Sequence, residues 1–403
     1  ATHKFAMYEK WPNLFSLLKS AGYRTALLGK IHVNPTSAFP LDSHWNPSSA
    51  ISFGKRDVRR IAEEAGKFIR AGDAPFVMSV NFPDAHYPLH RQLNGLPTFP
   101  QTAVDVKTLP WIGVDNERIR KHVADYYNCL ARLDTGIGLL LEELDNSGKA
   151  ENTIVIYLGD HGAQFSRGKT SVYEAGLRVP LIVRWPGHVK PGHVSHELVS
   201  SLDILPTVLQ ATNVKPPAGL DGRALQPLLE GRFVKWREHL FAHKMGSAAH
   251  FYYPQVAVRN ARYKLIANPL RRPNPPAQIY TDNSGVFFIA GTRKGEVAAA
   301  SLLIQKAYAT YHNPPPVELY DLQADPYEFK NLANDPKHAV AQKRLHSRLR
   351  EWQRDTGDPL VDAAALKRYT KEIDEAAAMK PFLAYRRDKN FRWRYLDWMK
   401  PKP

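Results

Sequence analysis

The chain has 403 residues, of which 43% are hydrophobic and 23% charged, a composition that fits a globular protein with a sizeable core. No run of apolar residues approaches the roughly 18 needed to cross a bilayer, so we expect no transmembrane segment. The single cysteine, Cys129, excludes an intrachain disulfide, and its apolar helical neighbours predict a buried thiol rather than a catalytic one.

The net charge of +16 favours a polyanionic partner. The basic residues are spread along the chain, and no zinc finger, helix-turn-helix or RNP-like motif accompanies them, so we do not expect nucleic acid as the partner. A sulfated glycan satisfies the same electrostatics. Charge alone does not decide between these classes.

Strand-like and helix-like segments alternate over the first part of the chain. This pattern predicts an α/β domain with a large, mainly parallel sheet flanked by helices, and we place it at residues 1–235. Predicted helices, some marked by apolar residues that recur at three and four, are 11–21, 57–71, 115–147 and 197–211. Predicted buried strands are 76–82, 153–158 and 181–185.

From residue 236 to residue 403 the pattern changes to that of a smaller α+β domain. The expected elements are a hairpin at 255–267, a helix near 298–310, a strand at 317–322 and a helix at 335–356. The chain from Lys380 onward is basic and aromatic. We expect this tail to lie on the surface or on a neighbouring subunit. In the second case the protein would form a homodimer.

The strand at 153–158 runs directly into Gly159, Asp160, His161 and Gly162. Parallel sheets place their sites at the carboxyl edge, so this motif puts an acidic group where a site is expected. Asp160 suits a hard divalent cation, and His161 could coordinate that cation or bind substrate. A strand-ending Asp that caps a turn is the structural alternative.

Two further segments carry cationic groups beside glycine. Lys30 and His32 follow a short strand that ends in Gly29, and alternation along an extended backbone points both side chains the same way. Lys169 lies next to Gly168 on a loop, where an ammonium group suits an oxyanion. Solvated surface residues are the alternative for all of them.

His86 follows the predicted strand at 76–82 within an Ala-His-Tyr-Pro loop. A general acid would be useful at such a strand end, although a lone histidine there is more often structural.

These motifs occur in one order along the chain: Lys-x-His, Ala-His-Tyr-Pro, Gly-Asp-His-Gly, then Gly-Lys and Tyr-Glu-Ala-Gly. In that order they resemble the sulfatase family of the alkaline-phosphatase superfamily. The resemblance covers residues 11 to about 355 and includes a Glu-Leu-Tyr-Asp-Leu strand at 318–322. Residues 29–33 and 356–359 are most similar to the heparan N-sulfatase (sulfamidase) members of that family.

The resemblance implies catalytic roles for four residues. Lys30 and Lys169 would bind the sulfate oxygens, His32 would hold the nucleophilic hydroxyl, and His86 would help to protonate the leaving group. Fixed ammonium groups suit this chemistry because cleavage places negative charge on the leaving atom and on the sulfuryl oxygens.

The resemblance also implies a calcium ion, Ca²⁺, with Asp160 and His161 among its ligands, although many members have Asn in place of His161. Sulfatases carry an Asp-Asp pair and a Cys-x-Pro-Ser-Arg-like motif, whose cysteine becomes the nucleophilic formylglycine. Neither motif occurs in this sequence, and Cys129 has other neighbours. We therefore expect the N-terminal part with the formylglycine to be missing and this chain alone to be inactive.

The expected reaction is hydrolysis of a sulfate ester or sulfamate on a sulfated sugar, such as an N-sulfoglucosamine unit of a glycosaminoglycan. A phosphoesterase of the same superfamily and a non-catalytic binder of sulfated polysaccharide remain as alternatives. His243, His250 and Arg259 are candidates for substrate binding in the second domain. The resemblance favours a periplasmic or secreted location, or a lysosomal one in a eukaryote.

Overall fold

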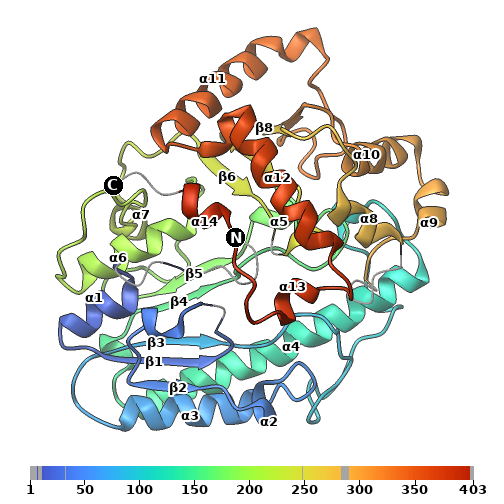
Figure 1. Ribbon diagram of the computed structural model, residues 1–403. Helices are drawn as coiled ribbons and strands as arrows, with labels where there is room; N and C mark the ends of the chain where they lie inside the picture. The colour runs from blue at the N-terminus through green and yellow to red at the C-terminus, as the bar shows by residue number, and fades with distance from the viewer. Residues whose placement is uncertain (1–6, 8–10, 32, 247, 283–289, 400–403) are drawn as a thin grey trace.

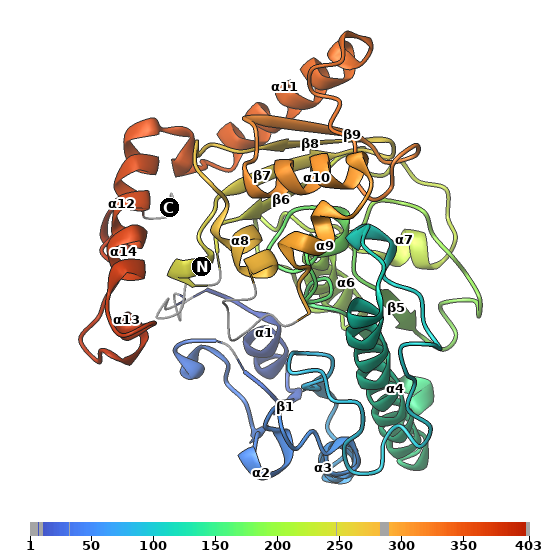
Figure 2. The ribbon, with the colours of Figure 1, turned by 90° about the vertical axis from the view of Figure 1, so that its right-hand side faces the viewer.

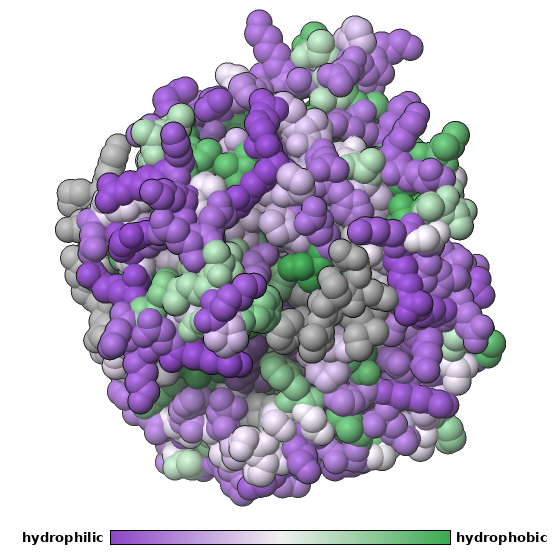
Figure 3. Space-filling view, turned by 45° about the vertical axis from the view of Figure 1, so that its right-hand side comes forward, coloured by the Kyte–Doolittle hydropathy of each residue, from purple (hydrophilic) through white to green (hydrophobic). Residues whose placement is uncertain are grey.

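A computed structural model describes residue 7 and residues 11–31, 33–246, 248–282 and 290–399. Figure 1 shows a sheet with two long helices at one end of the molecule and an antiparallel sheet at the other. Hydrophilic side chains cover most of the face seen in Figure 3, and apolar side chains lie among them in small groups. Among the described helices, none has both the length and the apolar character that a bilayer crossing requires.

The first sheet is built around β1 (Arg24–Gly29), which is almost wholly buried. β1 pairs in parallel with β2 (Ser43–Trp45) on one side and with β3 (Phe76–Asn81) on the other. Gly29 and Asn81 are partners in the register of β1 and β3. The segments that follow these two strands therefore leave the sheet at the same edge.

Two helices, α3 (Val58–Arg70) and α4 (Glu117–Asn146), pack against each other along the sheet (Figures 1 and 2). Each begins after a residue whose side chain accepts a backbone N–H of the first turn, Asp57 for α3 and Asn116 for α4. Both helices lie close to their predicted bounds.

A two-stranded antiparallel sheet of β4 (Val155–Leu158) and β5 (Leu181–Arg184) lies next to β3 (Figure 1). Val155 belongs to the same apolar cluster as Phe76 and Met78 of β3. The loop between β4 and β5 carries the Gly-Asp-His-Gly motif and the glycine-flanked lysine, so these also lie at the edge of the sheets.

The helix predicted at 197–211 is shorter than expected, because α6 begins only at Ile204 and ends at Ala211. The buried Asp203 carboxylate accepts the backbone N–H of Ser200 and pairs with Arg237. These bonds stabilise a turn before α6, so the preceding residues do not continue the helix.

An antiparallel sheet of order β6-β7-β8-β9 forms the C-terminal half, and α11 (Ala339–Asp355) packs on it. The α/β class with a smaller α+β part is thereby confirmed. The four strands are β6 (Leu240–Lys244), β7 (Gln255–Arg259), β8 (Tyr263–Ala267) and β9 (Val317–Asp321). Further helices are α1 (Leu14–Ser20), α2 (Ser48–Ile51), α5 (Glu174–Leu177), α7 (Gln226–Leu229), α8 (Pro275–Asp282), α9 (Lys294–Ala298) and α10 (Leu302–His312).

The basic, aromatic C-terminal segment is folded into the molecule rather than laid over it as a loose arm. It contains α13 (Ala384–Arg387) and α14 (Tyr395–Trp398), and it follows α12 (Ala363–Ala378). Tyr385 and Trp393 are fully buried in one aromatic cluster that also includes side chains of α12. The aromatic residues of this segment thus form a local core.

Gly29 lies where the backbones of β1 and β3 leave little room for an added side chain, so a substitution there tests this packing. Its φ is 95°, and a Cβ at this position would lie 2.1 Å from the carbonyl oxygen of Asn81. We expect Gly29→Ala to lower the free energy of unfolding by about 3 kcal/mol or more, because conformational strain and a clash add. Gly22→Ala is the matched control, since Gly22 also has a positive φ of 87° but open space around it. Its expected cost is about 1 kcal/mol. Equal losses for the two variants in urea denaturation would contradict the proposed clash.

Candidate active site at the carboxyl ends of the strands

The ends of β1, β3 and β4 bring most of the predicted site residues to one edge. Lys30 follows β1 directly, and its carbonyl oxygen accepts a hydrogen bond of 2.8 Å from the Asn81 side chain at the end of β3. His86 lies on the loop after β3, and Asp160 lies just beyond β4. His32, the partner predicted for Lys30, lies outside the described residues.

Lys30, Lys169 and Asp160 lie near one another, because the charge of Asp160 acts on the pKa of both lysines and the charge of Lys30 acts on the pKa of Lys169. Burial lowers the pKa of Lys30, and the Asp160 carboxylate opposes that shift. Burial also lowers the pKa of Lys169 to about 8, where Asp160 again opposes the shift and the Lys30 charge adds to it. Two cations that are partly desolvated and repel each other form a place where an anion binds favourably.

The His86 imidazole is neutral in this surrounding. Its pKa is lowered to about 4, chiefly by burial, and the charges of Lys169, Lys30 and Arg56 contribute in the same direction. Nδ1 lies 2.5 Å from the carbonyl oxygen of Tyr87. Because a carbonyl only accepts, Nδ1 carries the proton of the neutral ring, and Nε2 is left with a lone pair. A nearby anion would raise this pKa and favour protonation of Nε2.

Asp160 and His161 form a pair of acceptors at the end of β4. His161 Nδ1 lies 2.9 Å from the carbonyl oxygen of Gly162, so Nε2 carries the lone pair, and Nε2 lies 3.5 Å from Asp160 Oδ2. The carboxylate is 87% exposed. Burial, and then the charge of Lys169, lower the pKa of His161.

This pair fits a divalent cation only in part. Asp160 offers the oxygen that Ca²⁺ prefers, whereas the His161 nitrogen is a softer donor, and Ca²⁺ takes six to eight oxygen ligands. Within the described part of the chain, no group of three or more His, Cys, Asp or Glu side chains gathers as a metal site. A calcium ion bound here would need further oxygen ligands.

The loop that carries Lys169 is fixed by a fully buried arginine. Arg167 donates to the carbonyl oxygens of Ala307, Tyr327 and Glu328, at distances between 2.7 and 3.4 Å. Its guanidinium also lies 4.4 Å from the ring centroid of Tyr173. The second half of the chain therefore positions a residue of the candidate site.

A buried ion-pair cluster lies next to the His86 loop, and no motif in the sequence predicted it. Asp84 accepts from Arg56 at 2.6 Å and from Arg132 at 2.7 and 2.8 Å, and all three side chains are fully buried. Cys129 is also buried, and its Sγ lies 3.3 Å from Arg132 Nη2. The prediction of a buried thiol is confirmed, but its neighbours are charged rather than wholly apolar.

The three residues proposed for substrate binding lie in other surroundings. Arg259 pairs with Glu174 of α5. His250 packs against the ring of Phe382, and His243 lies on β6 with an exposed side chain. No contact found among the described residues joins these three to the lysine pair, and their role stays a prediction.

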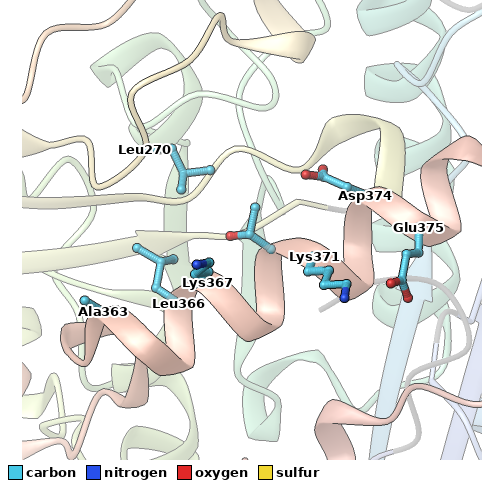
Figure 4. A pocket seen from close by; sticks show the side chains of 8 residues that line it. Leu270, Ala363, Leu366, Lys367, Lys371, Asp374 and Glu375 are labelled. Atoms are coloured by element: carbon cyan, nitrogen blue, oxygen red, sulfur yellow. The ribbon is translucent and has the colours of Figure 1, made fainter.

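A separate groove runs along α12 (Figure 4). Leu270, Leu366 and Thr370 line it together with charged side chains of the helix. None of the predicted site residues is among those that line this groove.

Comparison with protein families gives two matches. The family model described as sulfatase matches residues 7–214. The model described as N-sulphoglucosamine sulphohydrolase, C-terminal, matches residues 159–271.

Individual proteins agree with this family assignment. Human N-sulphoglucosamine sulphohydrolase is 31% identical over 90% of this chain and 77% of its own length. An ulvan-active sulfatase of Formosa agariphila is 28% identical over 86% of this chain, which spans 65% of that protein. A solved structure in complex with its substrate D-glucosamine-2-N,6-O-disulfate has a TM-score of 0.61 and 19% identity, covering 87% of this chain and 83% of the other. That last likeness supports the fold.

Removing the negative charge of Asp84 should cause a large loss of stability. Asp84→Asn would leave two buried guanidinium groups without a counterion, and we expect the free energy of unfolding to fall by about 3 to 5 kcal/mol. Asp145→Asn is the control, because Asp145 forms an exposed pair with Arg184 at 3.3 Å. That change should cost less than about 1 kcal/mol. Similar losses for both variants in chemical denaturation would argue against the cluster.

The lowered pKa of Lys169 predicts how anion binding depends on pH. Inorganic sulfate should bind to this chain best below pH 8, where Lys169 is protonated, and should weaken by about tenfold per pH unit above it. Titration calorimetry between pH 7 and pH 10 measures this. Lys169→Met should bind weakly with a flatter profile, whereas Lys306→Met, which removes an exposed lysine of α10, should behave like the unmodified chain. An affinity that stays constant up to pH 10 would rule out this role.

Proposed function

This chain belongs to the sulfatase family, and we propose that it contributes the sulfate-binding part of a site that hydrolyses sulfate esters or sulfamates on a sulfated sugar. N-sulfoglucosamine is the favoured unit, because the human relative is named for that substrate and the C-terminal family model carries the same name. The resemblance noted in the sequence is confirmed by these matches. The family is established, whereas the reaction, the sugar and the position of its sulfate are proposals.

The observation that carries the proposal is the pair of coupled ammonium groups beside a neutral imidazole. Lys30 and Lys169 present two positive charges, and the Asp160 carboxylate offsets only part of them. A sulfuryl group bears negative charge on its oxygens and gains more as its bond to the leaving atom breaks. Fixed cations that are already desolvated stabilise this developing charge more than water does.

His86 is suited to move the proton that the leaving group needs. In the surroundings described above, its pKa of about 4 leaves Nε2 unprotonated at neutral pH. The sulfuryl group would offset the charges of Lys30 and Lys169, which are among the causes of that low pKa. The imidazole would then take up a proton together with the anion and give it to the departing oxygen or nitrogen.

We propose that the nucleophile is not among the residues of this chain. Cys129 is buried, and burial together with the charge of Asp84 raises the pKa of its thiol, which disfavours the reactive thiolate. A formylglycine hydrate, as in the sulfatase family, is the proposed attacking group.

Ca²⁺ is the proposed metal ion, and Asp160 and His161 are its proposed ligands from this chain. When bound, the ion would supply positive charge for the sulfuryl oxygens. The nitrogen donor of His161 favours a second candidate function, a phosphoesterase with two transition-metal ions, since imidazole suits zinc better than calcium.

Sulfate release by the full-length natural protein tests the proposal. We expect release from N-sulfoglucosamine to exceed release from glucosamine 6-sulfate, and Lys30→Met to lower the rate by about 100-fold or more. Lys306→Met again serves as the control for loss of one lysine charge.

Metal analysis of the same protein separates the two candidates. One calcium ion per chain supports the sulfatase. Two zinc or manganese ions, together with faster hydrolysis of a phosphate ester than of a sulfamate, would replace it with the phosphoesterase.

A further inference from the structure

Phe53 contacts two groups of the candidate site, although no motif in the sequence marks it. Its ring stacks on the His86 imidazole, with the centroids 4.3 Å apart and the planes at 14°. The ammonium nitrogen of Lys30 lies 5.1 Å from the centroid of the same ring. An aromatic face attracts a cation, and a stacked ring keeps water from the imidazole. One side chain therefore acts on both the anion-binding group and the proton-transfer group.

The backbone of Phe53 is tied to the His86 loop by Arg56. Arg56 Nε donates to the carbonyl oxygen of Phe53 at 2.8 Å. Nη2 of the same guanidinium donates to the carbonyl oxygens of His86 at 2.7 Å and Pro88 at 2.6 Å. Because a guanidinium is planar and rigid, these bonds fix the two ring-bearing segments relative to each other.

The charge of Arg56 is balanced within the protein. Asp84 pairs with it at 2.6 Å and also accepts from Arg132, and all three side chains are shielded from solvent. A buried guanidinium with a counterion and carbonyl acceptors is stable in place, whereas an unpaired one would not be. The support beneath Phe53 is therefore rigid.

The ring itself is not simply part of the core. Phe53 is 37% exposed, so much of its surface is available at the site. Its position beside both an imidazole and an ammonium group indicates a role beyond packing.

We propose that Phe53, held by Arg56, is a positioning residue that fixes the His86 imidazole and the Lys30 ammonium for the sulfuryl group. The proposal rests on the proposed function for the identity of the anion. Phe53 acts through His86 and Lys30 and does not itself contact the reacting atoms.

The His86 titration gives a direct measure of this role. The charged groups that act on His86 are Lys169, Lys30 and Arg56, and burial is the larger cause of its low pKa. Loss of the stacked ring would admit water to the imidazole. The pKa of His86 should therefore rise from about 4 toward its ordinary value.

Three variants test the proposal. Phe53→Leu keeps an apolar side chain but removes the aromatic face, and Phe53→Tyr keeps the face. Phe99→Leu makes the same chemical change at a side chain that is 89% exposed. NMR titration of the His86 ring, assigned with His86→Gln, and calorimetry with inorganic sulfate supply the two measurements, and thermal melting confirms that each variant is folded.

We expect Phe53→Leu to raise the pKa of His86 by about one unit and to weaken sulfate binding by about three- to tenfold. Phe53→Tyr and Phe99→Leu should match the unmodified chain in both. The proposal is overturned if Phe53→Leu leaves the His86 titration as it is in Phe99→Leu, or if Phe53→Tyr fails to restore it. Neither titration requires turnover. An absence of sulfatase activity in the natural protein would therefore count against the proposed function, while the His86 titration would still decide the role of Phe53.

Discussion

The candidate site depends on holding two ammonium groups, Lys30 and Lys169, near each other in a partly buried place. Burial disfavours both charges, the positive charge of Lys30 adds to the cost at Lys169, and Asp160 offsets only part of that cost. Such groups cannot hold each other in position by mutual attraction. The backbone that carries them must therefore be fixed by other interactions, and the structure supplies these with buried arginines.

Arg56 and Arg167 serve the same purpose in two parts of the molecule. Both have at most 1% of their surface exposed, both have a positive φ, and each donates to three main-chain carbonyl oxygens. A positive φ is uncommon for a residue other than glycine, and it is maintained only where the surroundings define the conformation. Arg56 joins the segments that carry Phe53 and His86, and Arg167 joins the Lys169 loop to α10 and to the segment after β9. Two buried guanidinium groups, each hydrogen-bonded to main-chain carbonyl oxygens, thus hold the segments that carry the candidate site.

The sequence predicted the groups at the strand ends because their signal is local. Lys30, His86 and Asp160 each follow a short apolar run that ends in glycine or a turn. Parallel pairing of β1 and β3 brings the first two of these strand ends to one edge of the sheet. The supporting groups lack any such signal. Arg132 pairs with Asp84 from 48 positions away, and Phe53 lies in an irregular segment with no periodic pattern. α12 was missed because the basic aromatic residues that follow it indicated a tail, whereas in the fold those aromatic side chains bury one face of that helix.

The two predicted domains share the loop on which Lys169 lies. Glu174 of α5 pairs with Lys264 of β8 at 3.1 Å, and Lys264 pairs with Glu328 at 2.9 Å, with each side chain at most 13% exposed. Separation near residue 235 would expose or unpair all three charges, which is costly for buried ion pairs. The C-terminal family model matches residues 159–271 and so includes this loop together with the strands that hold it. The C-terminal sheet therefore helps to fix the loop that carries Lys169, and changes in that sheet can alter the candidate site from a distance.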